Sequence, residues 1–338
     1  MEKCKKCGGG LYFNPASQNL ICEKCNTEYD IKKDINFVRH SFEMEKPTVE
    51  QEIDKSGFKT HCPSCGATFG GDTFAISDVC SYCGAHLVVD FADGDSPDAV
   101  IPFAFDKVTA KSKFKAGLRH KWFLPNKFKK TPPDNTIESV YIPAYLCDVS
   151  TSNSYSGQLY TNHRKSDGDT YKSYTSISGT EDVVESNLML ECSSELTQAT
   201  LNEIAPYNVS SAYKFQPEFI LGYSVEYFNR NLEQGKRNLQ AMATANVRRK
   251  ILSNYSYDGV SYLNISTSYY NCSYSKIILP TYKVKYKYAG KEYITFMNGQ
   301  NGKVGGNVPR SKLKISVLVA LGLVGLGLLG YLIYLLTL

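Results

Sequence analysis

Eight cysteines in the first ninety residues are spaced so that they could bind two metal ions. They form four Cys-x-x-Cys pairs, with fourteen residues between the first and second pairs and fourteen between the third and fourth; the pairs are Cys4 and Cys7, Cys22 and Cys25, Cys62 and Cys65, and Cys80 and Cys83. Two residues between cysteines bring two thiolates to one side of a metal, and Zn²⁺ takes four such ligands at tetrahedral corners. The pattern predicts two structural zinc sites, each with four cysteine ligands.

The second set of cysteines repeats the first at an offset of 58 residues, and Gly8 then aligns with Gly66. Glycine after the second cysteine of a pair allows the backbone to turn tightly beneath the metal. The fourteen-residue spacer is long enough for a short hairpin that returns to the ion. We therefore predict two small β zinc ribbons that arose by duplication, at residues 1–31 and 59–91.

Two other uses of cysteine fit this pattern less well. Disulfides require an oxidising compartment, and charged residues rather than a signal peptide surround Cys4. A redox Cys-x-x-Cys normally occurs once, in a βαβ context. Four protein ligands leave no open position on the metal, so the predicted zinc ions are structural. Each ribbon is too small to bury a core, and zinc would supply about 10–16 kcal/mol of its folding free energy.

No other motif predicts catalysis, and we expect the protein not to be an enzyme. The five histidines are scattered, and the patterns HExxH, GxSxG and GxGxxG are absent from the sequence. Gly299-x-x-Gly302-Lys303 is shorter than a phosphate-binding loop and lacks the following Ser or Thr. A turn is the better interpretation of this segment.

The last 24 residues, 315–338, contain no charged residue. As a helix they would extend about 36 Å, and about 30 Å is enough to cross the hydrocarbon core of a bilayer. Arg310, Lys312 and Lys314 precede them, and positively charged flanks stay in the cytoplasm. We expect a tail-anchored, single-pass membrane protein whose N-terminal domains are cytoplasmic, a reducing location that suits zinc thiolates.

Between the ribbons and the apolar segment, the sequence predicts one α+β domain with mainly antiparallel strands, at residues 101–309. A charged linker at 32–58 joins the two ribbons. Strand patterns occur at 140–149 and in a long hairpin at 154–178, and a helical pattern occurs at 229–252. Ala289-Gly290 predicts a tight hairpin turn.

Residues 106–130 are strongly basic. They contain eight Lys and one Arg against one Asp, a net charge of +8, whereas the whole chain carries +5. Apolar residues recur every fourth position and predict an amphipathic helix with Asp106 as N-cap and an end near Pro125: Ala110, Phe114, Leu118 and Trp122. Its lysine face is either a solvated surface or a binding surface for anionic lipid.

The charge of the ribbons argues against nucleic-acid binding by the ribbons themselves. Residues 1–31 contain four Lys and four acidic residues, and residues 59–91 contain one Lys against three Asp, a net of −2. Four thiolates around Zn²⁺ add a formal −2 to each ribbon, and the resulting negative charge repels phosphate. The alternative function is therefore a membrane-tethered nucleic-acid-binding or regulatory zinc-ribbon protein that uses the basic residues 106–130.

Several segments resemble a bacterial family of membrane-associated TFIIB-type zinc-ribbon proteins, often mislabelled primosomal helicase-like. The resemblance is carried by the paired CxxCG ribbons, Ile101-Pro-Phe, the KWFLP sequence at 121–125, VYIPAY at 140–145, and LPTY at 279–282 before MNGQNGKVGG. Some family members are similar to membrane-anchored partners of phage-shock protein A and SPFH-domain proteins in envelope stress. The resemblance implies a zinc-binding adaptor that recruits such proteins to the lipid bilayer of the bacterial cell membrane.

Overall fold

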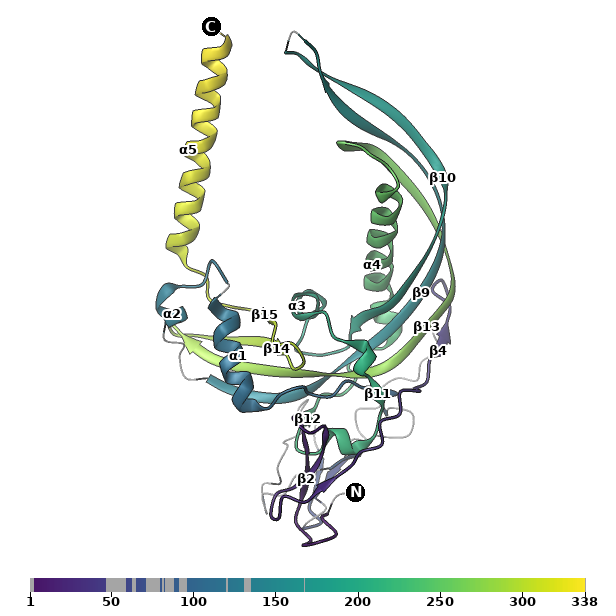
Figure 1. Cartoon of the computed structure of the whole chain (residues 1–338), viewed down its shortest axis with the longest axis vertical. Coiled ribbons are helices and arrows are strands. Elements are labelled where there is room, and N and C mark those ends of the chain that lie inside the picture. The colour runs from purple at the N-terminus through teal and green to yellow at the C-terminus, as the bar shows by residue number, and fades with distance from the viewer. Residues whose placement is uncertain are drawn as a thin grey trace. The chain divides into compact units, whose positions relative to one another are not determined.

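The computed structural model describes residues 3–46, 59–62, 65–70, 80, 82, 88–90, 96–119, 121–130, 135–166 and 168–337 (Figure 1). The chain divides into two compact units. The first comprises Met1–Pro102, Tyr141–Gln198 and Asn208–Leu279, and the second comprises Phe103–Val140, Ala199–Tyr207 and Pro280–Leu338. Strands β9 (Asn135–Arg164) and β13 (Gly259–Tyr288) contribute residues to both units.

The N-terminal end of the first unit is a small antiparallel sheet of β1 (Leu11–Asn14), β2 (Asn19–Cys22) and β3 (Glu28–Tyr29), in the order β1-β2-β3. Leu11 and Phe13 alternate with half-buried neighbours along β1, as expected for a strand with one buried face. The hairpin predicted between the first two cysteine pairs is confirmed.

A second small sheet contains β5 (Lys59–His61), β6 (Thr68–Gly70) and β7 (Val88–Asp90), in the order β6-β5-β7. Both of its pairings are antiparallel. Most of the spacer between the third and fourth cysteine pairs, and Cys83 itself, lie outside the described residues.

The large sheet has the order β10-β9-β13-β14-β15, in which β10 is Thr170–Glu191, β14 is Lys291–Asn298 and β15 is Val304–Gly306. Strands β9 and β10 form a long antiparallel hairpin that turns between Arg164 and Thr170, as the sequence predicts. Pro143 lies inside β9, one residue beyond the last pair with β10, and its carbonyl accepts from Cys192 N at 3.3 Å.

Short strands join this sheet: β4 (His40–Phe42), β8 (Ala99–Val100), β11 (Tyr213–Lys214) and β12 (Ser224–Val225). Strand β4 comes from the segment predicted as the linker, and it pairs with β13 through Phe42 and Cys272. Arg39 forms an ion pair with Asp148 at 3.2 Å. Residues 39–42 of the linker segment are thus held against the large sheet.

Helix α4 (Leu232–Ser253) packs on β10 in the first unit, along one face of the long strands in Figure 1. The side chain of Asn231 accepts a hydrogen bond from Gln234 N, and the two residues form a capping box. Leu232, Leu239 and Ile251 lie on its buried side, so the helix predicted at 229–252 is confirmed.

The second unit contains α1 (Lys107–Arg119), α2 (Asn126–Lys130), most of α3 (Gln198–Ile204), β14 and β15. Its core is aromatic: the rings of Phe103 and Tyr282 lie 4.8 Å apart, and those of Phe128 and Tyr286 lie 5.2 Å apart. Ala289 and Gly290 both have positive φ, at 50° and 76°, as the predicted two-residue hairpin turn requires.

One prediction about the basic segment is wrong. Asp106 caps α1, because its carboxylate accepts from Thr109 N at 2.8 Å, but the helix ends at Arg119 and Trp122 is 72% exposed. Lys121 N donates to Leu118 O, and Leu124 N donates to Lys121 O. These two bonds close a turn before Pro125. The four-residue spacing of apolar side chains therefore continues to Trp122, beyond the end of the helix at Arg119.

The C-terminal segment is one helix, α5 (Lys312–Thr337). Its window Lys312–Gly330 has a mean hydropathy of 2.2, and none of that window is buried. By length and composition this helix could cross a membrane.

Candidate metal centre

The first ribbon brings its four cysteines together at one end of the small sheet. Their Sγ atoms all lie within 4.8 Å of one another. The Sγ atoms of Cys4 and Cys25 are 3.6 Å apart, and the Sγ atom of Cys7 lies 3.4 Å from those of Cys22 and Cys25. Zn–S bonds of about 2.3 Å in a tetrahedron place sulfurs about 3.8 Å apart, so a small shift around an ion would satisfy this geometry. The four side chains could hold a metal ion.

Two tight backbone turns aim these thiols at a common point. Cys4 N donates to Gly9 O and Gly8 N donates to Cys4 O, both at 2.8 Å, and Gly8 has φ +69°. In the second turn Asn26, with φ 55°, takes the place of glycine, and its N–H donates to Cys22 O at 3.0 Å. Asparagine tolerates this left-handed conformation better than other side chains.

Two hydroxyl groups that the sequence analysis did not single out contact the thiols. The Tyr29 hydroxyl accepts from Lys5 N at 3.0 Å and lies 3.2 Å from Cys4 Sγ. The contact with the Tyr29 hydroxyl, together with backbone N–H groups of the loop, lowers the pKa of Cys4 to about 6. The Thr27 hydroxyl lies 3.0 Å from Cys25 Sγ and lowers the pKa of that thiol. Both contacts favour the thiolate form that metal binding needs.

The pKa of Cys7 moves in the opposite direction. The backbone N–H of Gly9 favours its thiolate, but contacts with Cys22 and Cys25 outweigh that bond and raise the pKa of Cys7 to about 12. Thiols this close cannot all ionise without a cation, because their charges repel. A divalent ion at the centre would remove this conflict, and the donor set of four thiols therefore fits Zn²⁺.

Three cysteines of the second ribbon are also clustered. The Sγ atoms of Cys62, Cys65 and Cys80 lie within 4.8 Å of one another, and Cys65 and Cys80 are 3.7 Å apart. These three could hold a metal ion. Cys83, the predicted fourth ligand, lies outside the described residues.

The duplication extends from the cysteines to the backbone. Cys62 N donates to Ala67 O and Gly66 N donates to Cys62 O, both at 2.8 Å, which repeats the first turn of the first ribbon 58 residues later. The bridge between Lys3 and Gly10 likewise recurs as the pair formed by His61 and Thr68. The first cysteine loop of each cluster therefore has the same backbone hydrogen bonds.

The first ribbon is docked on its own unit through the end of the hairpin away from the cysteines. Phe13 N donates to Leu221 O at 2.9 Å, and the Phe13 ring lies 5.7 Å from that of Phe219, in the short helix η3 (Pro217–Ile220). Phe13 is fully buried. The exposed loops of the ribbon are the two that carry the cysteines, and Lys5, Lys6 and Lys24 are exposed there.

The remaining cysteines have no role in these clusters. Cys147, Cys192 and Cys272 are buried free thiols, and free cysteine is among the most buried residue types. Burial raises the pKa of Cys147 and of Cys272 and keeps both thiols protonated.

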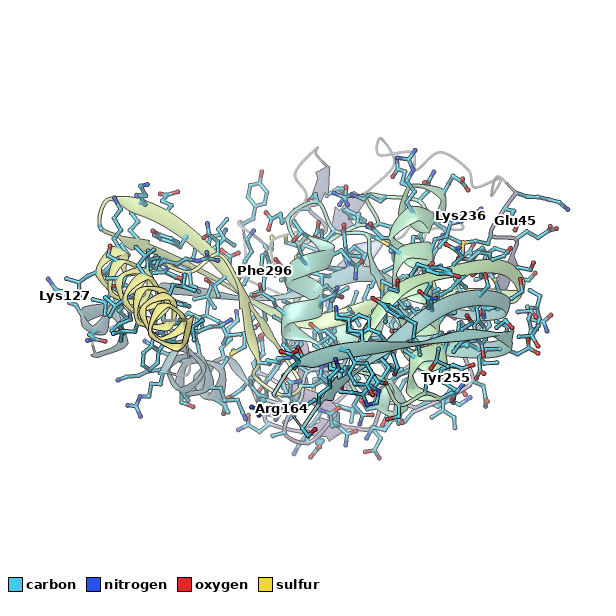
Figure 2. The ribbon with its side chains drawn as sticks, turned by 90° about the horizontal axis from the view of Figure 1, so that it is seen from above. Glu45, Lys127, Arg164, Lys236, Tyr255 and Phe296 are labelled. Atoms are coloured by element: carbon cyan, nitrogen blue, oxygen red, sulfur yellow. The ribbon has the colours of Figure 1, made fainter. Side chains whose placement is uncertain are left out.

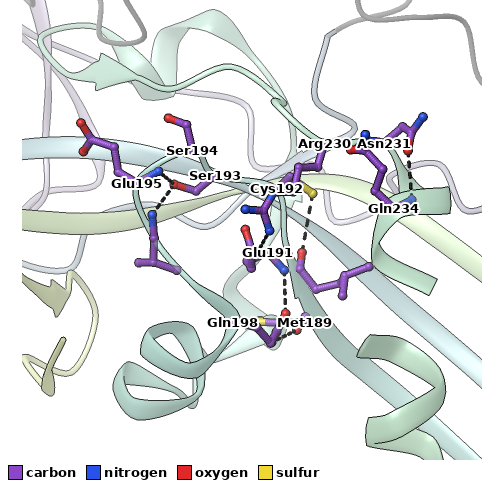
Figure 3. A network of polar contacts seen from close by, with 12 residues as sticks. Met189, Glu191, Cys192, Ser193, Ser194, Glu195, Gln198, Arg230, Asn231 and Gln234 are labelled. Atoms are coloured by element: carbon purple, nitrogen blue, oxygen red, sulfur yellow. Dashed lines mark hydrogen bonds and ion pairs between the residues drawn. The ribbon is translucent and has the colours of Figure 1, made fainter. Parts of the chain in front are cut away.

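A buried polar network, which no sequence pattern indicated, joins the end of β10 to the start of α4, and Figure 3 shows the part of it that contains Glu191 and Arg230. Glu191 pairs with Arg230, and the Glu226 carboxylate accepts from the hydroxyls of Ser193 and Ser194 at 2.8 Å. Burial raises the pKa of both carboxyl groups. These bonds connect the end of β10 to the residues before α4 and orient the connection between the two elements.

No family model and no solved structure matches this chain. It is similar to the uncharacterized protein YdjG of Bacillus subtilis (strain 168), with 24% identity over 322 residues that cover 93% of this chain and 91% of that protein. The chain is therefore a distant homologue of a protein of the same overall extent.

Proposed function

We propose that the protein is a zinc-binding membrane adaptor. In this proposal α5 anchors the chain in a bacterial cell membrane, the rest of the chain is cytoplasmic, and the two zinc ribbons present binding surfaces to protein partners. The observation that carries the proposal is the combination, in one chain, of a four-thiol cluster and an exposed apolar helix. Four protein ligands leave no coordination position on the metal for a substrate, which suits a structural role.

The cysteine-bearing loops of the first ribbon are the proposed contact surface. Its opposite end is occupied by Phe219 and Leu221, whereas Lys5, Lys6 and Lys24 are exposed beside the thiols. These lysines partly offset the negative charge of a zinc thiolate centre, so the surface combines both signs of charge. Such a surface favours selective binding of a charged protein partner.

Partner binding can be tested without loss of the metal. The resemblance of the sequence makes phage-shock protein A and SPFH-domain proteins the first partners to test. We expect the triple variant Lys5→Glu, Lys6→Glu and Lys24→Glu to keep its zinc but to lose about tenfold or more in affinity, equivalent to about 1.4 kcal/mol. Affinity would be measured on the full chain in detergent, with zinc content determined in the same samples.

Two further variants complete this experiment. Cys62→Ser with Cys65→Ser should remove one zinc and any contact made by the second ribbon. Lys165→Glu, at the exposed turn of the β9–β10 hairpin, is the charge control and should bind as the wild type does. Equal binding by all variants would contradict a ribbon-based adaptor. Salt-sensitive binding of a polynucleotide instead would support the alternative nucleic-acid function.

A further inference from the structure

The loop between α1 and α2 is tied to the start of α5. Ser311 N donates to Phe123 O at 2.7 Å. The Lys314 ammonium donates to the carbonyls of Trp122 at 3.1 Å and Leu124 at 2.9 Å. All of these residues belong to the second unit. The loop is thus fixed at the position along the chain where the apolar helix begins (Figure 1).

The same loop exposes two aromatic rings. Trp122 is 72% exposed and Phe123 is 39% exposed, whereas Leu124 is buried and holds the loop to its unit. Tryptophan is enriched at the headgroup level of membrane proteins, because its ring is apolar and its N–H needs a polar partner. Side chains held at the base of a membrane helix would lie at that level.

The chain segments that adjoin the loop and the start of α5 are basic. Residues 119–130 and 307–337 contain eight Lys and Arg and no Asp or Glu. One of the eight, Lys121, lies 3.9 Å from Glu203. Among the described residues no carboxylate pairs with Lys127 or Lys312, and both are exposed. Figure 2 looks nearly along α5 and labels Lys127, which belongs to α2.

Distance along α1 limits which lysines can act with this group. Lys107 precedes Arg119 by twelve residues, or about 18 Å of helix, and salt screens exposed charges over about 8–10 Å. The C-terminal end of α1 is the end that leads into the loop beside α5. The basic segment therefore divides into a part near the base of α5 and a part remote from it.

We propose that the residues around the base of α5 form an interfacial collar that binds the headgroups of anionic phospholipids. The collar consists of Arg119, Lys121, Trp122, Phe123, Lys127, Arg310, Lys312 and Lys314. The two rings insert at headgroup depth, and the cations bind lipid phosphate. This inference rests on the proposed anchoring by α5 and adds the lipid class and the residues that recognise it.

Trp122 is the only tryptophan of the chain and reports directly on the collar. The full-length protein would be reconstituted into vesicles of phosphatidylcholine, with and without phosphatidylglycerol. With the anionic lipid we expect a blue shift of tryptophan emission, loss of acrylamide quenching, and stronger quenching by a shallow than by a deep doxyl-labelled lipid. Emission that is the same in both vesicles, or fully quenched by acrylamide, would overturn the collar.

Charge variants test the cations separately from the rings. Lys127→Glu with Lys312→Glu should abolish the difference between the two lipid compositions. Lys107→Glu is the matched control and should retain that difference, since its new charge lies far from the collar and at a helix N-terminus that favours an acidic side chain. Equal loss in both variants would overturn the assignment of these cations.

Flotation of the vesicles separates the two proposals. Protein that floats and resists alkaline extraction, but whose Trp122 stays in water, would overturn the collar and leave anchoring by α5 intact. Protein that does not float would overturn both. A tryptophan shift caused by a polynucleotide, rather than by phosphatidylglycerol, would overturn the assignment to lipid.

Discussion

The hydroxyl of Tyr29 accepts from Lys5 N and contacts Cys4 Sγ at 3.2 Å, so it links the first cysteine loop to the last strand of the ribbon. A donor to sulfur stabilises the thiolate and orients it towards the ion. At the scale of single residues, metal affinity therefore depends on side chains that do not bind the metal. Cys-x-x-Cys spacing predicts the ligands, but it contains no information about this tyrosine.

Substitution Tyr29→Phe removes that hydrogen bond and leaves the packing volume nearly unchanged. We expect zinc affinity of the first ribbon to fall by about tenfold, since loss of such a partner typically costs 10–100-fold. Transfer of zinc to a chelating dye would measure it. Tyr262→Phe, on the exposed side of β13, is the control and should release zinc as the wild type does. Equal zinc release by Tyr29→Phe and the wild type would contradict a role for the hydroxyl.

At the scale of elements, local pattern predicted much of the fold. The first ribbon hairpin, the β9–β10 hairpin, the Ala289-Gly290 turn and α4 all follow from spacing and turn residues. The pairing of β4 with β13 does not, because it joins Phe42 to Cys272 and no local periodicity encodes a partner so distant in sequence. The end of α1 was missed because apolar spacing continued to Trp122 after the hydrogen bonds of the helix had stopped.

Close packing of α4 on β10 gives an element-scale prediction. A Cβ added to Gly235 would lie 2.2 Å from Leu190 Cδ2, and Leu190 is buried. Gly→Ala inside a helix ordinarily stabilises by about 1 kcal/mol. Here we expect Gly235→Ala to destabilise, because overpacking in a core costs about 1–3 kcal/mol. Thermal unfolding of the full chain in detergent would measure the change.

A double-mutant cycle identifies the cause of that effect. Leu190→Val alone should destabilise by leaving a small cavity, but combined with Gly235→Ala it should recover part of the lost stability. Strictly additive effects would show that the two side chains do not compete for the same space.

At the scale of the whole molecule, the metal and the membrane features belong to different units. The cysteine clusters lie in the first unit, and α1, α2 and α5 lie in the second. The cysteine spacing and the terminal apolar segment predicted these two features independently. The sequence does not show that Phe13 docks the first ribbon on Phe219 and Leu221, because a single buried aromatic side chain has no sequence signature of its partner.

Removal of zinc should therefore affect one unit selectively. The first ribbon has a small core of its own, and its metal would supply about 10–16 kcal/mol of folding free energy. With a chelator, we expect amide protection to be lost along β1 and β2. The loss should include Phe13 N in β1, which donates to Leu221 O. Protection in β14 should persist, because its hydrogen bonds to β13 and β15 lie in the second unit. Hydrogen exchange followed by mass spectrometry would measure both regions in one sample.

Two cysteine variants control this experiment. Cys22→Ser should reproduce the loss of protection without chelator. Cys192→Ser, at a buried cysteine outside the clusters, should not. Equal loss of protection in β14 would contradict a metal whose stabilising effect is confined to the first unit.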